Sequence, residues 1–197
     1  MVLIEHSLYG KGNIKRNYFG FAYSVGTFCF VDIFGKKAIQ RAAFFPPTRG
    51  IEKIAYRINL PATFILLAVP FFLGIKFTGL VGFAGLVMFV GGLILYTLSI
   101  VQFARPEHSG INRTGLYRFS RNPMYVAFFI YFLGCCLLTR SWLFFGVLAI
   151  FQVSVHFLIL SEERWCKNEF GEIYEVYFKN VGRYFNIRTQ TKLFKNL

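Results

Sequence analysis

The residues best suited to chemistry lie in one short polar stretch, Gly115–Tyr125, which reads "GLYRFSRNPMY" and stands just before an apolar run. Asn122 followed by Pro123 predicts a helix start, because asparagine caps helices and proline fits their first turn. Arg118 and Arg121 add positive charge beside that start. Helix-start amides and guanidinium groups both favour anions, and arginine can hold a carboxylate or phosphate with two hydrogen bonds. The stretch therefore predicts an anion-binding corner.

A second group with chemical potential is the acidic pair Glu162 and Glu163, which follows directly on a later apolar run. Ionisable groups near the apolar part of the membrane cost free energy, and they tend to mark functional sites. The glutamates further along, Glu169, Glu172 and Glu175, are better read as a solvated face. A cationic corner and an acidic pair at the two ends of one helical hairpin would suit a small zwitterionic ligand. The alternative is a helix cap with a positive flank and no ligand.

Other residues near the corner extend the candidate site. Gly115 allows a backbone conformation or a close approach that other residues resist. Tyr117 and Tyr125 flank the corner with aromatic faces, and His108, in "RPEHSG", is a further candidate contact. His156 lies within an apolar run and is better read as a packed, hydrogen-bonded side chain than as a catalyst.

The composition places these groups in a membrane protein. Of the 197 residues, 55% are hydrophobic and only 16% are charged, which is too apolar for an ordinary soluble domain. The formal charge of +13 comes from basic residues between apolar spans, where membrane topology and anionic lipids explain it better than nucleic acid does. The four cysteines form no CxxC pair, so no metal site is expected.

The elements that position the site are apolar helices, and the fold class we predict is an all-α integral membrane protein. It would be a bundle of four or five transmembrane helices, depending on whether the weak candidate Phe19–Phe34 crosses. Residues 123–138 and 142–160 are joined by "TRSW", so they should form an antiparallel hairpin. Frequent glycines in the second span indicate close helix packing, with a groove for a lipid chain as the alternative. The clear spans are 54–75, 80–104, 123–138 and 142–160.

Basic residues concentrate in the segments after the weak span, between spans two and three, and in the tail, so these segments should be cytoplasmic. The tail, "EERWCKNEFGEIYEVYFKNVGRYF", reads as an amphipathic helix that Gly171 interrupts and can bend. Its predicted apolar stripe is Phe170, Ile173, Tyr174, Tyr177 and Val181. We divide the chain into N-terminal membrane helices (1–108), a cofactor-binding hairpin with the amphipathic segment (109–185) and a basic tail (186–197).

The corner, the hairpin and the tail together resemble a known family. "GLYRFSRNPMY", followed by a hairpin and then "EERWCKNEFGEIYEVY" and "GRYF", is similar to the integral-membrane methyltransferases, over about 109–185. These comprise isoprenylcysteine carboxyl methyltransferases and phospholipid methyltransferases. The resemblance implies S-adenosylmethionine bound at the cytoplasmic ends of the last two helices, closed by the tail, with S-adenosylhomocysteine as product. The acceptor would be a lipid or lipidated molecule from the bilayer.

The resemblance also implies roles for the candidate residues. The carboxyl methyltransferases usually carry histidine where Asn122 stands, so "NPMY" is closer to the phospholipid enzymes. We expect catalytic roles for Arg121, Glu162 and Glu163. The expected cofactor-binding residues are His108, Gly115, Tyr117, Arg118, Arg121, Asn122, Pro123, Tyr125, Glu162 and Glu163.

Two other functions remain open from the sequence. The "EERWCKNEFGEIYEVY" segment also resembles the C-terminal pattern of NADPH-dependent membrane sterol reductases. A lipid-binding membrane protein without enzymatic activity is the other alternative, and it would not need the corner and the glutamates to face each other.

Overall fold

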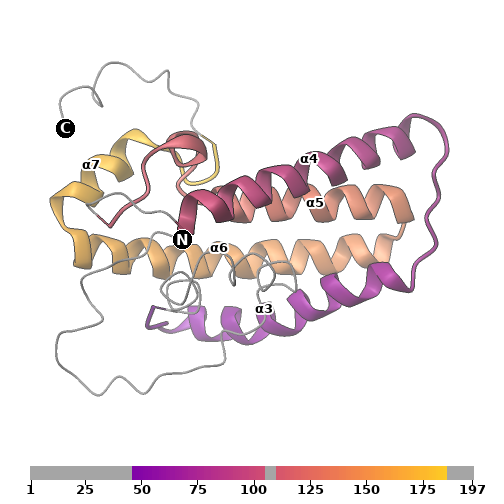
Figure 1. Ribbon diagram of the computed structural model, residues 1–197. Coiled ribbons are helices and arrows are strands. Elements are labelled where there is room, and N and C mark those ends of the chain that lie inside the picture. Colours follow the sequence, from indigo (N-terminus) through magenta and orange to yellow (C-terminus); the bar gives the residue numbers. More distant parts are fainter. Residues whose placement is uncertain (1–45, 105–109, 186–197) are drawn as a thin grey trace.

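The computed structural model describes residues 46–104 and 110–185, and over these ranges the chain is helical, without strands. Long helices run side by side, and the short elements gather at one end of the bundle (Figure 1). The elements are α3 (Ile51–Ala68), η2 (Val69–Phe71), α4 (Gly79–Ala104), η3 (Gly115–Arg118), α5 (Pro123–Thr139), α6 (Trp142–Phe170) and α7 (Glu172–Asn180). The predicted spans 80–104 and 123–138 therefore match α4 and α5 to within a residue.

Three described helices are long and apolar enough to cross a membrane: Ile51–Phe71, Gly79–Ala104 and Trp142–Phe170. The shorter apolar helix Pro123–Thr139 packs among them. Large apolar side chains of α4 face outward, as expected in contact with lipid. The structure thus confirms an all-α integral membrane protein. The weak candidate span 19–34 lies outside the described residues, so the choice between four and five spans stays open.

Helices α4 and α5 approach each other unusually closely because glycines form their contact. A Cβ atom added at Gly92 would lie 2.4 Å from the backbone nitrogen of Tyr131, and one at Gly134 would lie 2.4 Å from the backbone nitrogen of Phe89. At Gly91, by contrast, an added Cβ would meet nothing within 4 Å. Close packing, one of the two readings of these glycines, is therefore what the α4–α5 contact displays.

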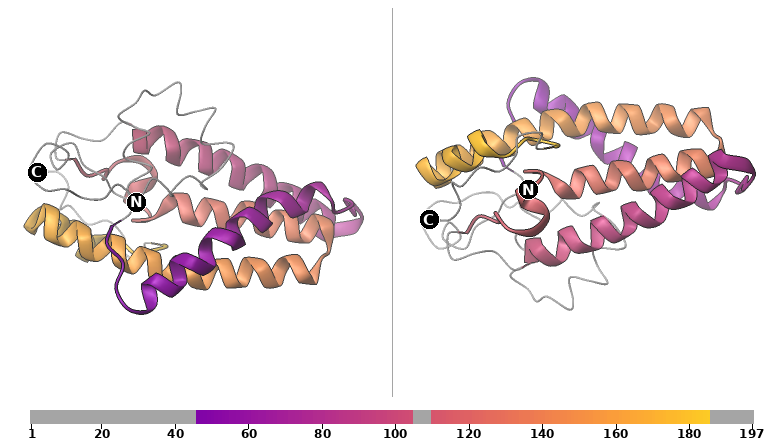
Figure 2. Two further views of the ribbon diagram at one scale, coloured as in Figure 1. Left: turned by 90° about the horizontal axis from the view of Figure 1, so that it is seen from below. Right: turned by 90° about the horizontal axis from the view of Figure 1, so that it is seen from above.

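The predicted hairpin of α5 and α6 turns at Arg140, whose backbone is left-handed with φ 50°. The two helices nevertheless have other main partners, since α5 packs chiefly on α4 and α6 chiefly on α3. In the view from below, α3 crosses the bundle obliquely (Figure 2). Between α5 and α6 the aromatic contacts include Phe128 with Phe151, at 5.9 Å between ring centroids, and Phe132 with Phe144, at 6.2 Å.

The last helix contains the predicted span 142–160 but is longer, because α6 has 29 residues and continues to Phe170. The segment read as the start of a separate tail helix is thus the end of α6. A new helix, α7, begins only after Gly171. The positive φ of Gly171, 53°, bends the chain between the two helices, as predicted. On α7, Tyr174 and Tyr177 are buried, but Ile173 is 49% exposed. The predicted stripe is therefore incomplete, and an amphipathic membrane-surface role for this helix stays a prediction.

Two polar contacts fix α3 against α6. Within the apolar part, the side-chain amide of Asn59 donates a 3.0 Å hydrogen bond to the hydroxyl of Ser154. Near the end that carries α7, Arg164 forms a two-pronged ion pair with Glu52, at 2.5 and 2.7 Å. These contacts hold in place the part of α6 from which the two predicted site glutamates project.

Candidate functional site

The corner begins where the end of α4 meets η3. Gly115 has φ +57°, and a Cβ atom there would lie 2.5 Å from the side chain of Gln102. The oxygen of Gln102 accepts a 2.8 Å hydrogen bond from the backbone N–H of Leu116. The expectation that Gly115 permits a close approach is therefore met, and the partner in that approach is α4. Gln102 had no sequence signal of its own, because a lone glutamine at a helix end has many ordinary uses.

Pro123 is the first residue of α5, as predicted, and Asn122 occupies the N-cap position. The prediction that the Asn122 side chain caps the helix was wrong. Its amide instead donates a 3.2 Å hydrogen bond to the backbone carbonyl of Arg183, a carbonyl that also accepts from the hydroxyl of Ser120 at 3.1 Å. The Asn122 side chain, which was expected to cap α5, thus bonds to a carbonyl from a distant part of the chain.

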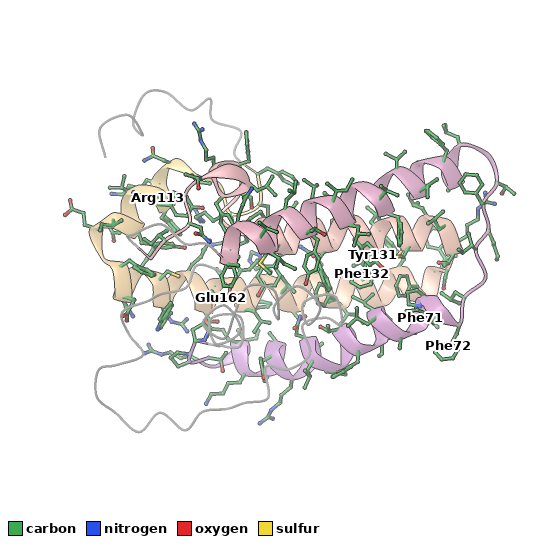
Figure 3. All side chains as sticks on the ribbon, in the orientation of Figure 1. Phe71, Phe72, Arg113, Tyr131, Phe132 and Glu162 are labelled. Carbon is green, nitrogen blue, oxygen red and sulfur yellow. The ribbon has the colours of Figure 1, made fainter. Side chains whose placement is uncertain are left out.

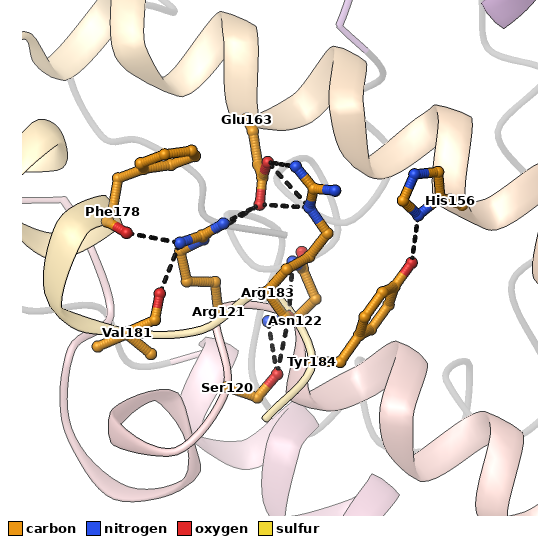
Figure 4. A network of polar contacts seen from close by, with 9 residues as sticks. All are labelled: Ser120, Arg121, Asn122, His156, Glu163, Phe178, Val181, Arg183 and Tyr184. Carbon is orange, nitrogen blue, oxygen red and sulfur yellow. Dashed lines mark hydrogen bonds and ion pairs between the residues drawn. The ribbon is translucent and has the colours of Figure 1, made fainter. Parts of the chain in front are cut away.

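Arg121 is buried and its guanidinium group is held on several sides (Figure 4). It donates to Oε1 of Glu163 at 2.7 and 3.1 Å, and to the carbonyls of Phe178 and Val181 at 2.7 and 2.5 Å. It also lies 4.0 Å above the centroid of the Phe178 ring, a favourable cation–π contact. Arg121 therefore links the start of α5 to α6, to the end of α7 and to Val181, the residue that follows α7.

Glu163 has a second cationic partner, Arg183, which donates to Oε2 at 2.7 Å and reaches both carboxylate oxygens through its Nε at 3.1 Å (Figure 4). The ion pair with Glu163 raises the pKa of Arg183 above its usual range. Both oxygens of Glu163 are therefore occupied by guanidinium groups of this chain. We call Arg121, Glu163 and Arg183 the arginine clamp.

Glu162 has a different environment, although it is the next residue and is buried as well. The hydroxyl of Tyr125 donates a 2.9 Å hydrogen bond to its Oε1. Tyr117 is fully buried nearby, and burial, followed by the negative charge of Glu162, raises the pKa of Tyr117 far above its ordinary value. Among the described residues the Tyr117 hydroxyl has no hydrogen-bond partner. Glu162 thus faces two phenols, whereas Glu163 faces two guanidinium groups.

The segment Val181–Phe185, which we call the strap, runs back from α7 across the corner. The backbone N–H of Arg121 donates to the carbonyl of Gly182 at 2.9 Å. Further out, the hydroxyl of Tyr184 lies 2.9 Å from Nδ1 of His156 (Figure 4). Burial raises the pKa of the Tyr184 phenol, so this group stays protonated well above neutral pH. The strap therefore bonds to the corner and joins it to the apolar part of α6.

The structure brings most of the predicted site residues together. Glu162 lies at the α7 end of the bundle, far from Tyr131 and Phe132 (Figure 3). Arg118, by contrast, is exposed on the surface, and His108 lies outside the described residues. The residues that meet at the corner, the end of α6 and the strap are Tyr117, Arg121, Asn122, Pro123, Tyr125, Glu162 and Glu163.

Sequence reasoning missed two residues of this site, Arg183 and Tyr184. Their only signal was the "GRYF" that formed part of the family resemblance, since Arg183 otherwise counted as one of many basic residues in the tail. His156 was predicted to be a hydrogen-bonded side chain, and its contact with Tyr184 confirms this.

One comparison with known proteins bears on this arrangement. Residues 80–173 match the family model of the phospholipid methyltransferases, a range that begins in α4 and ends at the start of α7. No curated protein and no solved structure was found to match the chain. The match covers slightly less than half of the chain, includes the corner and both glutamates, and confirms the resemblance to a membrane methyltransferase family.

Proposed function

We propose that this chain, whose residues 80–173 match the phospholipid methyltransferase family, transfers a methyl group from S-adenosylmethionine to a lipid-like acceptor in the membrane. The observation that carries the proposal is the fully buried hydroxyl of Tyr117, which has no hydrogen-bond partner among the described residues and lies close to the buried Glu162. Glu162 also accepts a hydrogen bond from Tyr125, whereas Glu163 is paired with Arg121 and Arg183. A buried polar group without a partner is costly, so a ligand that bonds to the Tyr117 hydroxyl would offset that cost.

The residues present fit the methionine part of S-adenosylmethionine. The Tyr117 hydroxyl, buried and without a described hydrogen-bond partner, and the Glu162 carboxylate would receive its amino group or sulfonium. Tyr125 would orient Glu162 through the 2.9 Å hydrogen bond between them. The first turn of α5, with Pro123 at its start, would supply the amides that favour the carboxylate.

The arginine clamp has a positioning role in this proposal. The guanidinium of Arg121 already donates to Glu163 and to two carbonyls, so it contributes positive charge at the corner and holds the strap in place. Glu163 has no oxygen outside the reach of its two arginines, so it organises the site. This refines the expected roles: Glu162 would be the catalytic carboxylate, with Arg121 and Glu163 positioning the strap and α6 around it.

When bound, S-adenosylmethionine supplies an activated methyl group whose bond to sulfur breaks as the bond to the acceptor forms. The chain's part would be to align the partners and to exclude water, and the burial of Tyr117 and Tyr125 supports that role. An ammonium acceptor must first lose a proton, and Glu162 would receive it. A carboxylate acceptor would need no base. Lipid acceptors would reach this end of the bundle from the bilayer, on the side predicted to be cytoplasmic.

Cofactor-dependent stabilisation of the purified protein in detergent tests the proposal. We expect S-adenosylhomocysteine to raise the melting temperature, because a ligand that binds only the folded state stabilises it. NADPH, the cofactor of the alternative membrane reductase, should have no effect. Stabilisation by NADPH alone would favour the reductase, and stabilisation by neither cofactor would favour a lipid-binding protein.

A variant pair locates the binding site. Glu162→Gln removes the buried charge while keeping its shape, so the shift caused by S-adenosylhomocysteine should fall sharply. Glu172→Gln, an exposed glutamate on α7, is the matched control and should keep the full shift. An unchanged shift in Glu162→Gln would remove this residue from the cofactor site.

A further inference from the structure

An exposed basic pair lies on the first two turns of α3, on the face turned away from the bundle. Lys53 and Arg57 are exposed, whereas Glu52, Ala55 and Asn59 on the other side of the helix are buried. The two basic residues are about 40° apart around the helix and about 6 Å apart along its axis. Since α3 is an outer helix beside α6 (Figure 1), this face meets the surroundings of the protein.

The basic pair has no acidic partner within the described part of the chain. Between residues 46 and 104 the one acidic residue is Glu52, and both of its carboxylate oxygens accept hydrogen bonds from Arg164. The ion pairs among the described residues involve neither Lys53 nor Arg57. Like charges one helical turn apart repel each other. An anion from outside the described chain would therefore stabilise the pair.

The depth of Arg57 indicates which anion can reach it. This residue lies six positions after the start of the apolar helix Ile51–Phe71, or about 9 Å along its axis. A cation on the outer face at this depth is costly unless it is neutralised, and a long basic side chain can extend towards the lipid headgroups. The anions at that level are lipid phosphates, which arginine binds with two hydrogen bonds.

The surface below the pair is apolar and exposed. Phe64 is 56% exposed and follows Arg57 by seven positions, so it lies within about 20° of Arg57 around the helix and about 10 Å deeper. Positive charge above and apolar surface below match the order of phosphate and acyl chain in a phospholipid. A lipid with net negative charge fits best, because the ammonium of a zwitterionic lipid would be repelled by the same two cations.

We propose that Lys53 and Arg57 bind the phosphate of an anionic phospholipid on the outer face of α3, with its acyl chain beside Phe64. This lipid is a bound partner and not a methyl acceptor, so the site is independent of the methyltransferase function. It lies on the side of the membrane that the sequence predicts to be cytoplasmic. The Glu52–Arg164 ion pair joins the same end of α3 to α6, so the bound lipid stabilises this contact as well.

The first test measures lipid affinity by native mass spectrometry of the whole protein in detergent. The probes are phosphatidylglycerol, which is anionic, and phosphatidylcholine with the same acyl chains, which is zwitterionic. We expect the first bound phosphatidylglycerol to bind more tightly than phosphatidylcholine. Lys53→Gln and Arg57→Gln should each lower its affinity about fivefold, the effect of one basic group at the membrane surface. The double variant should show no preference between the two lipids.

A control variant separates a site from general attraction by net charge. Lys76→Gln/Lys179→Gln removes the same number of positive charges from two exposed lysines outside α3 and should keep the wild-type affinity. Melting temperatures check the fold: phosphatidylglycerol should raise the melting temperature of the wild type and of the control, but not that of Lys53→Gln/Arg57→Gln. Without lipid, Lys53→Gln/Arg57→Gln should melt no lower than the wild type, because the repulsion between the pair is removed.

The second test locates the lipid with a phosphatidylglycerol that carries a photoactivatable diazirine in its acyl chain. Mass spectrometry should find more labelling of the α3 peptide around Phe64 than of α4, whose outer face is also apolar and exposed. This excess should disappear in Lys53→Gln/Arg57→Gln.

Three results would overturn the proposal: equal affinity for the two lipids, unchanged phosphatidylglycerol affinity in Lys53→Gln/Arg57→Gln, or an equal loss in the control variant. The first would assign the face to zwitterionic lipid, and the third would assign the binding to net charge. The Kd for S-adenosylhomocysteine should be the same in the wild type and in Lys53→Gln/Arg57→Gln. A wild type that does not bind S-adenosylhomocysteine but binds phosphatidylglycerol through the pair would refute the methyltransferase and support the anionic-lipid site.

Discussion

The arginine clamp yields a prediction whose size follows from its contacts. Arg121 is buried, and its replacement by alanine removes its bonds to Glu163, two bonds to backbone carbonyls and the contact with Phe178. Breaking a buried ion pair costs about 3–5 kcal/mol. Glu163 retains Arg183 in this variant, so we expect Arg121→Ala to lower the free energy of unfolding by about 3 kcal/mol, the low end of that range.

Arg183 should matter much less on its own. Its side chain is 27% exposed, and Glu163 keeps the buried Arg121 when Arg183 is removed. We expect Arg183→Ala to cost about 1 kcal/mol, as for a partly solvated pair. The double variant leaves Glu163 buried without either arginine, so its cost should exceed the sum of the single costs by about 1–3 kcal/mol.

The assay is reversible unfolding of the protein in mixed micelles with increasing sodium dodecyl sulfate, followed by circular dichroism. Adding Glu163→Gln to the double variant is the matched control, because it removes the stranded charge and should recover part of the lost stability. Equal costs for the two single variants, or strictly additive costs in the double variant, would refute the clamp as described.

Two other predictions concern packing and pH. Gly92→Ala and Gly134→Ala should each cost about 1–3 kcal/mol in the same unfolding assay, because the added Cβ would meet backbone atoms at 2.4 Å. Gly91→Ala is the control and should be tolerated, because an added Cβ there meets no atom within 4 Å. Equal effects of the three substitutions would contradict the close α4–α5 contact. Burial raises the pKa of both Tyr117 and Tyr174 above the ordinary value, so the folded state binds these phenolic protons more tightly than the unfolded state. Their contribution to stability is full below about pH 10 and is lost as the pH rises above it. The melting temperature, measured from pH 8 to 11.5, should therefore decrease less steeply at the alkaline end in Tyr117→Phe than in the wild type.

The sequence was informative wherever a local pattern set the structure. Apolar runs located α4 and α5, and Asn122–Pro123 located the start of α5. The proximity of Arg121 to Glu163 followed from one argument, that the two ends of a hairpin meet on one side of the membrane. These features depend on neighbours in sequence or on a single turn, so a pattern can predict them.

The features that the sequence did not predict depend on long-range contacts. The amide of Asn122 bonds to the Arg183 carbonyl, 61 residues away, because the strap returns to the corner. The strap has no regular structure and therefore no periodic pattern, so the "GRYF" of the family resemblance was the only signal for Arg183 and Tyr184. The end of α6 was misplaced for a different reason: polarity rises after Leu160, although the backbone stays helical to Phe170. The roles of the site residues in binding and catalysis remain predictions, and His108 lies outside the described residues.

The central claim is that Glu162 serves methyl transfer to a membrane lipid. The most direct measurement incubates the protein in membranes with S-adenosylmethionine carrying an isotopically labelled methyl group and a total lipid extract, and identifies labelled lipids by mass spectrometry. The account predicts a labelled lipid with the wild type and with Glu172→Gln, and its near-complete loss with Glu162→Gln. Absence of any labelled lipid with the wild type, or equal labelling with Glu162→Gln, would contradict it.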